Sequence, residues 1–300
     1  MQNRRILLVK TGASGDVVRT STLLHLYQND QVVWISKGAN CDLLPQELPN
    51  LSILDIDQAA HQDLGHFDLV ISLDDELSCA QLATKASKDK LVGAYVDDGK
   101  VLYSEDSSEW FDMGLISKFG KQQADEIKKQ NTASVQEILF RMMGHVFAGE
   151  EYLIREDVPA KPQAKLVGIE NRAGDRWPTK CWDKYEELAD QLRDRGFRIR
   201  FFEQRDHLKD YIQDISECSI FISGDTLGMH LALALKIPSV ALFTCTSSTE
   251  IYGYQRMKKI VSSKLMDAFY TREYRQDVLD AITVDEVLDA ILSLESQNPN

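Results

Sequence analysis

The chain has 300 residues, of which 43% are hydrophobic and 27% are charged, a composition typical of a globular protein and not of a disordered or fibrous one. Its formal net charge of −13 argues against broad binding to nucleic acid or anionic lipid, which requires a basic surface. The five cysteines have no CxxC spacing, so we expect neither a disulfide framework nor a zinc site, and a reducing cytoplasm is the natural compartment.

The first half of the chain predicts strands that alternate with helices. It begins with an apolar run at 5–10, which is too short for a signal peptide or a membrane span, followed by a glycine-containing turn and an apolar helical pattern at 17–28. Further strands are predicted at 31–35, 51–56, 68–73, 90–95 and 100–104, and a helix at 134–145. This alternation indicates a parallel α/β sheet.

The second half repeats the pattern after a proline-containing segment. Residues 155–165 lack apolar periodicity and are predicted to link a domain at 1–155 to one at 166–300. Strands are predicted at 166–170, 197–202, 219–223 and 239–243, and helices at 182–195, 208–215, 227–236 and 283–294. Thr283 and Glu286 form a capping-box pattern for the last helix, which we expect either to stay on the second domain or to pack back on the first.

The first turn, GASGD, lies where a strand passes into a helix, at the edge where open α/β sheets bind ligands. Gly12 and Gly15 allow a ligand to approach the backbone, and a helix N-terminus attracts anions. Asp16 has two interpretations that the sequence leaves open. It is either the N-cap of the helix or a catalytic carboxylate.

An equivalent turn in the second half has the sequence SGDTLGMH. Asp225 and Thr226 offer hydroxyl recognition and helix capping. His230 lies about 1.5 helical turns beyond Asp225 and reaches a ligand only if the helix begins at or after Thr226. Taken alone, a histidine of this kind is more often a hydrogen-bonded structural residue than a phosphate ligand.

Three other clusters are candidates for chemistry. Arg172, Arg176 and Lys180 follow a predicted strand and form either a diphosphate clamp or a solvated loop. The hydroxyl-rich segment at 244–253, which contains Thr246, is a weaker candidate for nucleotide or sugar contacts. The acidic group at 74–76 lacks further ligands at a telling spacing, so no metal site is expected.

Read together, KTGASGDVVRTSTLL, RWPTKCW and SGDTLGMHLALALKIPSVALFTCTSSTEIYG resemble the heptosyltransferase family, glycosyltransferase family nine. The resemblance implies a GT-B fold, in which two Rossmann-like domains face a central cleft. The N-terminal domain would hold the acceptor and the C-terminal domain the nucleotide sugar. It further implies an inverting transfer that uses neither a metal nor another cofactor, with Asp16 as the general base.

The resemblance also assigns binding roles. Lys180 and Arg172 would hold the diphosphate, His230 and the helix N-terminus would neutralise the leaving group, and Asp225 would bind sugar hydroxyls. The full set of expected donor contacts is Gly15, Arg172, Lys180, Glu203, Asp225, Thr226, Gly228, His230 and Thr246, and Arg19 is the expected acceptor contact. The chain departs from the family at Leu227, where many relatives have glycine, and residues 267–282 lack the cysteines of a metal finger.

These motifs predict transfer of heptose from ADP-heptose to a hydroxyl in glycan or glycoconjugate biosynthesis, such as that of lipopolysaccharide. Transfer from another nucleotide sugar, a non-catalytic nucleotide-sugar binder and a sugar-nucleotide epimerase are the alternatives. The acidic chain favours a soluble glycan, a lipid-linked glycan or a protein as acceptor at least as much as an anionic lipid surface.

Overall fold

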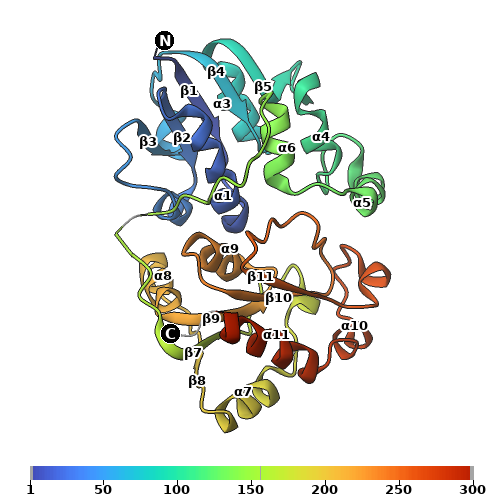
Figure 1. Ribbon diagram of the computed structural model, residues 1–300. Helices are drawn as coiled ribbons and strands as arrows, with labels where there is room; N and C mark the ends of the chain where they lie inside the picture. The colour runs from blue at the N-terminus through green and yellow to red at the C-terminus, as the bar shows by residue number, and fades with distance from the viewer. Residues whose placement is uncertain (1–2, 156, 298–300) are drawn as a thin grey trace. The chain divides into compact units, whose positions relative to one another are not determined.

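The computed structural model describes residues 3–155 and 157–297. The chain divides into two compact units, Met1–Glu156 and Asp157–Asn300, and each is an α/β structure built on its own sheet (Figure 1).

The first unit contains one mixed sheet. Within residues 3–155 six strands pair in the order β3-β2-β1-β4-β5-β6. The strands from β1 to β5 are parallel and β6 is antiparallel to β5, because the two are joined by a short turn. Their bounds are β1 Arg5–Val9, β2 Gln31–Ser36, β3 Leu51–Asp55, β4 His66–Ser72, β5 Ser87–Asp97 and β6 Lys100–Tyr103.

Helices and 3₁₀-helices connect these strands: α1 Ser14–Thr20, η1 Ser21–Tyr27, η2 Gly38–Leu43, α2 Ile56–Ala59, α3 Leu77–Lys85, η3 Glu105–Ser107, α4 Ser108–Asp112, α5 Gly120–Gln130 and α6 Val135–Met142. The single helix predicted at 17–28 is wrong in detail. The hydroxyls of Ser21 and Thr22 donate to the carbonyls of Val18 and Arg19, which accompanies the change to 3₁₀ geometry at Ser21.

Alternation along β1 places apolar side chains on both faces of the sheet. Ile6 and Leu8 belong to a core with Trp34, whereas Leu7 and Val9 belong to a second core on the opposite face. Because β1 is covered on both faces, the turn that follows it is anchored to the centre of the unit.

The second unit contains a parallel sheet. Within residues 157–297 five strands pair in the order β11-β10-β9-β7-β8. The strands are β7 Gln163–Glu170, β8 Arg198–Phe201, β9 Cys218–Gly224, β10 Ser239–Phe243 and β11 Met257–Val261. The helices are η4 Pro178–Lys180, α7 Tyr185–Asp194, α8 Leu208–Ser216, α9 Leu227–Ala234, η5 Leu265–Ala268, α10 Gln276–Asp280 and α11 Val284–Gln297.

Two features of this unit differ from the sequence prediction. β11 was not predicted, because a five-residue strand with two lysines lacks a clear apolar pattern. β7 begins at Gln163, inside the predicted linker, where Gln163 pairs with Cys218 at the edge of a register shift. The apolar face of α11 packs on α7 and on the second sheet, within this unit.

No helix in the part of the chain that the structure describes is both long and apolar enough to span a membrane.

Candidate functional site

The order of strands in the first sheet locates its ligand-binding edge. β1 has β2 on one side and β4 on the other, so the direction of strand addition reverses between β1 and β4. In open α/β sheets ligands bind beyond the carboxyl ends of the strands at such a switch point. Here the turn at 10–16 follows β1 and Asp74 follows β4, so the two segments meet at this edge.

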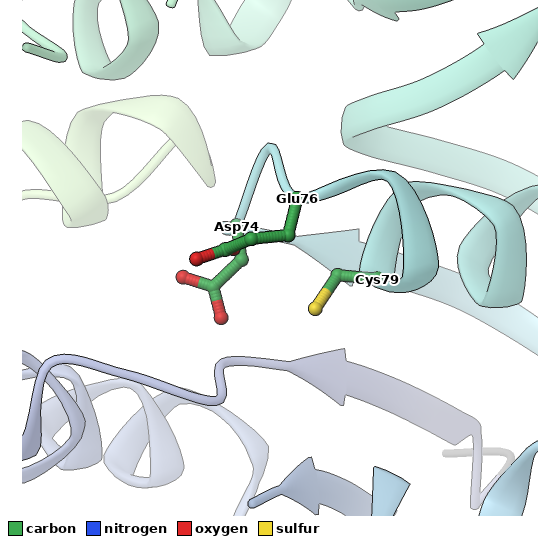
Figure 2. A group of neighbouring side chains, drawn as sticks. All are labelled: Asp74, Glu76 and Cys79. Carbon is green, nitrogen blue, oxygen red and sulfur yellow. The ribbon is translucent and has the colours of Figure 1, made fainter. Parts of the chain in front are cut away.

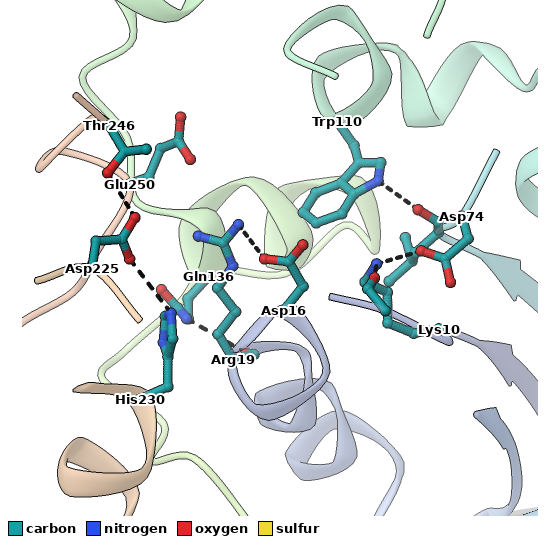
Figure 3. Close-up of polar contacts among 12 residues, drawn as sticks. Lys10, Asp16, Arg19, Asp74, Trp110, Gln136, Asp225, His230, Thr246 and Glu250 are labelled. Carbon is teal, nitrogen blue, oxygen red and sulfur yellow. Dashed lines mark hydrogen bonds and ion pairs between the residues drawn. The ribbon is translucent and has the colours of Figure 1, made fainter. Parts of the chain in front are cut away.

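Asp16 lies in the first turn of α1 and pairs with a cation. The helix begins at Ser14 with Ala13 as its N-cap residue, so the interpretation of Asp16 as the N-cap is wrong. A carboxylate oxygen of Asp16 lies 2.6 Å from Nη2 of Arg19, one turn later, and the two side chains point toward one another (Figure 3). The positive charge favours the ionised form of the carboxylate, which a general base requires.

Side chains on neighbouring segments hold the turn before Asp16. Asn40 donates to the carbonyl of Thr11 at 2.7 Å, and Ser14 donates to the amide oxygen of Asn40 at 2.7 Å. Beneath them Lys10 forms a buried ion pair with Asp74. Burial alone would lower the pKa of Lys10, but the negative charges of Asp74 and Asp16 raise it above its usual value.

Asp74 also belongs to a group of possible metal ligands. Its carboxylate, that of Glu76 and the thiol of Cys79 offer ligand atoms within 4.8 Å of one another (Figure 2). However, one oxygen of Asp74 already accepts from Lys10 and the other from Thr11. Both oxygens of Asp74 therefore already have hydrogen-bond partners within the first unit.

The second sheet has its switch point between β7 and β9, because β8 lies on one side of β7 and β9 on the other. Asp225 follows β9, and the 3₁₀-helix that contains Lys180 lies in the connection after β7. Lys180 donates to the Asp225 carboxylate at 2.8 Å and to its carbonyl at 2.6 Å. Thr246 donates to the same carboxylate at 2.7 Å, and Nε2 of His230 lies 3.8 Å from the other oxygen (Figure 3).

These contacts determine the charge of Asp225. Burial alone would raise its pKa, but the charge of Lys180, the proximity of His230 and the hydrogen bonds from Lys180 and Thr246 hold it well below its usual range. Asp225 is therefore a carboxylate at neutral pH, an acceptor suited to hydroxyl groups. Lys180 contacts this carboxylate, whereas the sequence assigned it to a diphosphate.

The N-terminus of α9 lies directly after Asp225. The helix begins at Leu227 with Thr226 as its N-cap residue, so the condition for His230 to lie near this end is met. The Thr226 hydroxyl makes no capping hydrogen bond, and it lacks a hydrogen-bond partner among the described residues. The Thr226 hydroxyl oxygen is itself buried, so the groups at this end that are suited to an anion are the first amides of the helix.

Two predicted donor contacts make other contacts in the structure. Arg172 forms a bidentate pair with Glu170, with both nitrogen-to-oxygen distances 2.8 Å, and Tyr211 donates to the same carboxylate at 2.8 Å. Gly228 packs against the hydroxyl of Tyr211, where a side chain would clash. Glycine is therefore required here by packing within the unit.

The remaining predicted residues are placed without a contact that defines a role. Glu203 is exposed after β8, and Gly15 lies in the first turn of α1 beside Asp16. The sequence missed the roles of Lys10 and Glu170. For Lys10 the available signal was a charged residue at the carboxyl end of an apolar strand, with the opposite charge of Asp74 after another predicted strand. Glu170 also ends an apolar strand, but its partner Arg172 lies in the loop that follows.

Solved glycosyltransferase structures share the fold of these two α/β units, which is the GT-B fold. The glycosyl transferase family 9 protein from Veillonella parvula matches with a TM-score of 0.64 at 15% identity, over 98% of this chain and 98% of that chain. E. coli heptosyltransferase WaaC with ADP-2-deoxy-2-fluoro heptose matches with a TM-score of 0.59 at 16% identity, over 96% of this chain and 99% of that chain. E. coli ADP-heptose lipopolysaccharide heptosyltransferase II matches with a TM-score of 0.58 at 16% identity, over 99% of this chain and 100% of that chain.

Residues 205–277 match the model of glycosyltransferase family 9 (heptosyltransferase). No curated protein matches the sequence. The predicted resemblance to the heptosyltransferases is thereby confirmed, as is the α/β GT-B fold, and the activity that these findings support is glycosyl transfer.

Proposed function

We propose that the chain is an inverting glycosyltransferase that moves heptose from ADP-heptose to a hydroxyl of a carbohydrate, lipid-linked or protein acceptor. One observation carries this proposal. The motifs that contain Asp16 and Asp225 each follow a central strand at the switch point of its sheet, where α/β sheets bind ligands.

Asp16 would act as the base. Its carboxylate accepts the proton of the acceptor hydroxyl while that oxygen forms a bond to the anomeric carbon of the donor. The bond from the anomeric carbon to the diphosphate breaks, and its electron pair leaves with ADP. The Asp16–Arg19 pair supports this role because it holds the carboxylate in one orientation before the acceptor binds. Arg19 would also contact the acceptor.

The second unit would bind the donor. The N-terminus of α9, which begins after Thr226, and His230 would stabilise the charge that develops on the leaving diphosphate. Asp225 would accept hydrogen bonds from sugar hydroxyls, and Lys180 and Thr246 would hold it in place.

The other donor contacts follow from position in the fold. Gly15 would allow the donor to approach the turn, Arg172 would reach the diphosphate from its pair with Glu170, and Glu203 would bind the ribose from the end of β8.

The choice of donor is supported by the similar solved structures, which include WaaC with a fluorinated ADP-heptose and an ADP-heptose heptosyltransferase. A different nucleotide sugar is the second candidate, and Leu227 favours it, because this first residue of α9 stands where many family members have glycine. A cytoplasmic location and a reaction without a metal complete the proposal.

Calorimetry with ADP, UDP and GDP, followed by turnover with the matching sugar nucleotides and a panel of oligosaccharide acceptors, tests the function. We expect ADP to bind at least 10-fold more tightly than UDP, and ADP-heptose to turn over in the presence of EDTA. Tight binding of ADP-heptose without release of ADP under any acceptor would identify a non-catalytic binder. Preference for UDP or GDP would identify the second candidate. Release of free nucleotide without an acceptor would identify an epimerase.

A further inference from the structure

The proposed mechanism does not use the buried ion pair of Lys10 and Asp74. Their side chains are only 4% and 6% exposed. Lys10 donates to one carboxylate oxygen of Asp74 and to the carbonyl of Gly12. The other oxygen of Asp74 accepts from the backbone nitrogen of Thr11 and, at 2.8 Å, from its hydroxyl. These hydrogen bonds all end on the turn between β1 and α1.

Stability alone does not explain a charged pair at this position. Residues 6–9 of β1 are apolar and fully buried, and a buried ion pair is often no more stabilising than apolar side chains of similar volume. The pair instead orders backbone groups of Thr11 and Gly12, which lie beyond the end of the strand. Buried polar groups of this kind need partners, and here they find them in two charged side chains.

The ordered turn leads directly into the helix that bears the base. The backbone nitrogen of Val17 donates to the carbonyl of Ala13 at 3.0 Å, so the first turn of α1 is built on the residue after Gly12. Asp16 precedes Val17, and its charge interacts with that of Lys10. The position of Asp16 therefore depends on how the turn is held, and from that position its carboxylate points toward Arg19 (Figure 3).

We propose that Lys10 and Asp74 are positioning residues for Asp16. They fix the turn between β1 and α1 and thereby hold the carboxylate in the direction that accepts the proton. This inference rests on the proposed function, since it assumes that Asp16 is the base. Neither residue contacts the reacting atoms. Loss of the pair should lower kcat and leave donor binding intact.

The test is the double variant Lys10→Met/Asp74→Asn, which removes both charges together and so avoids an unpaired buried ion. We expect kcat to fall at least 10-fold, while the KM for ADP-heptose and the Kd for ADP stay within 2-fold of wild type. The matched control is Asp30→Asn. Asp30 pairs at 2.7 Å with Arg4, which directly precedes β1. Its loss therefore removes an ion pair at the start of the strand and leaves the turn after the strand untouched. This variant should keep kcat within 2-fold.

A second arm separates positioning from general damage. In an Asp16→Asn background the double variant should lower the residual rate by less than 2-fold, because a residue that acts through the base has no further effect when the base is absent. Hydrogen exchange of the peptide that covers 10–17 should be at least 10-fold faster in the double variant and unchanged in Asp30→Asn.

The possible outcomes decide between the two proposals. If Asp16→Asn is inactive while the double variant keeps its kcat and its protection from exchange, positioning is wrong and the base assignment stands. Equal multiplicative losses with and without Asp16 would also overturn positioning. If Asp16→Asn turns over normally, the proposed function fails, and positioning of the base fails with it.

Discussion

Replacement of Lys180 by methionine tests how the second unit uses its buried charges. Lys180 and Asp225 are only 10% and 16% exposed, so the substitution leaves a carboxylate without its cation in a site that excludes most water. Removal of one partner of a buried pair costs about 3–5 kcal/mol. For a unit of this size about 4 kcal/mol corresponds to a fall of roughly 10 °C in the unfolding temperature.

Urea unfolding of the ligand-free protein, followed by tryptophan fluorescence, measures this cost. The same substitution in an Asp225→Asn background should cost only about 1 kcal/mol, because an amide has no charge to neutralise. The difference between the two backgrounds is the coupling energy, which we expect to be about 2–4 kcal/mol. An equal loss in both backgrounds would refute the argument that Lys180 acts through Asp225.

The Lys180–Asp225 pair also predicts how the stability of the second unit changes at acidic pH. Burial raises the pKa of Asp225 in the folded protein, but the charge of Lys180 and the other contacts outweigh burial and lower it. The stabilisation from the ionised carboxylate is therefore complete above the ordinary aspartate pKa of about 4. It is lost as the pH falls below that value toward the lowered pKa. The stability advantage of wild type over Asp225→Asn should therefore be constant from pH 7 to 5 and shrink between pH 4 and 2.

Other substitutions probe single features of each unit. Gly228→Ala should destabilise the second unit by about 1–3 kcal/mol in thermal unfolding, since the new methyl group meets the hydroxyl of Tyr211; Tyr211→Phe should recover part of the loss, and no recovery would contradict this contact. Ser134→Ala removes both hydrogen bonds of its side chain in the capping box of α6 and should lower the free energy of unfolding of the first unit by about 1 kcal/mol. An unchanged midpoint in urea unfolding would show the cap to be unimportant. Alkylation at pH 8 followed by peptide mapping should modify half-buried Cys181 before Cys218, whose thiol pKa burial raises to about 12; the reverse order would contradict the assigned burial.

The alternation of strands and helices could be predicted because each buried strand leaves a continuous apolar run. Strand β11 and the change from α-helix to 3₁₀-helix at Ser21 could not. A short edge strand needs only one buried side chain, here Ile260, and its register is set by pairing with β10. The helix change depends on hydroxyl groups that donate to nearby carbonyls, and serine and threonine do this in several kinds of structure.

The candidate site shows the same division between local and tertiary information. The sequence placed Asp16 and Asp225 at the ends of strands, and the strand order makes these positions the two switch points. It did not show that Lys180 would contact Asp225, because 45 residues separate them along the chain. Nor did it show that Arg172 would pair with Glu170, two residues earlier, since that contact depends on where β7 ends.

The central claim is that Asp16 removes the proton of the acceptor. The most direct measurement compares release of ADP from ADP-heptose by wild type and by Asp16→Asn, which keeps the shape of the side chain and removes its basicity. Positioned bases contribute about 10²–10⁴-fold, so we expect kcat to fall by at least 100-fold while the Kd for ADP stays within 2-fold. An Asp16→Asn variant that transfers heptose at a rate near that of wild type would contradict the account.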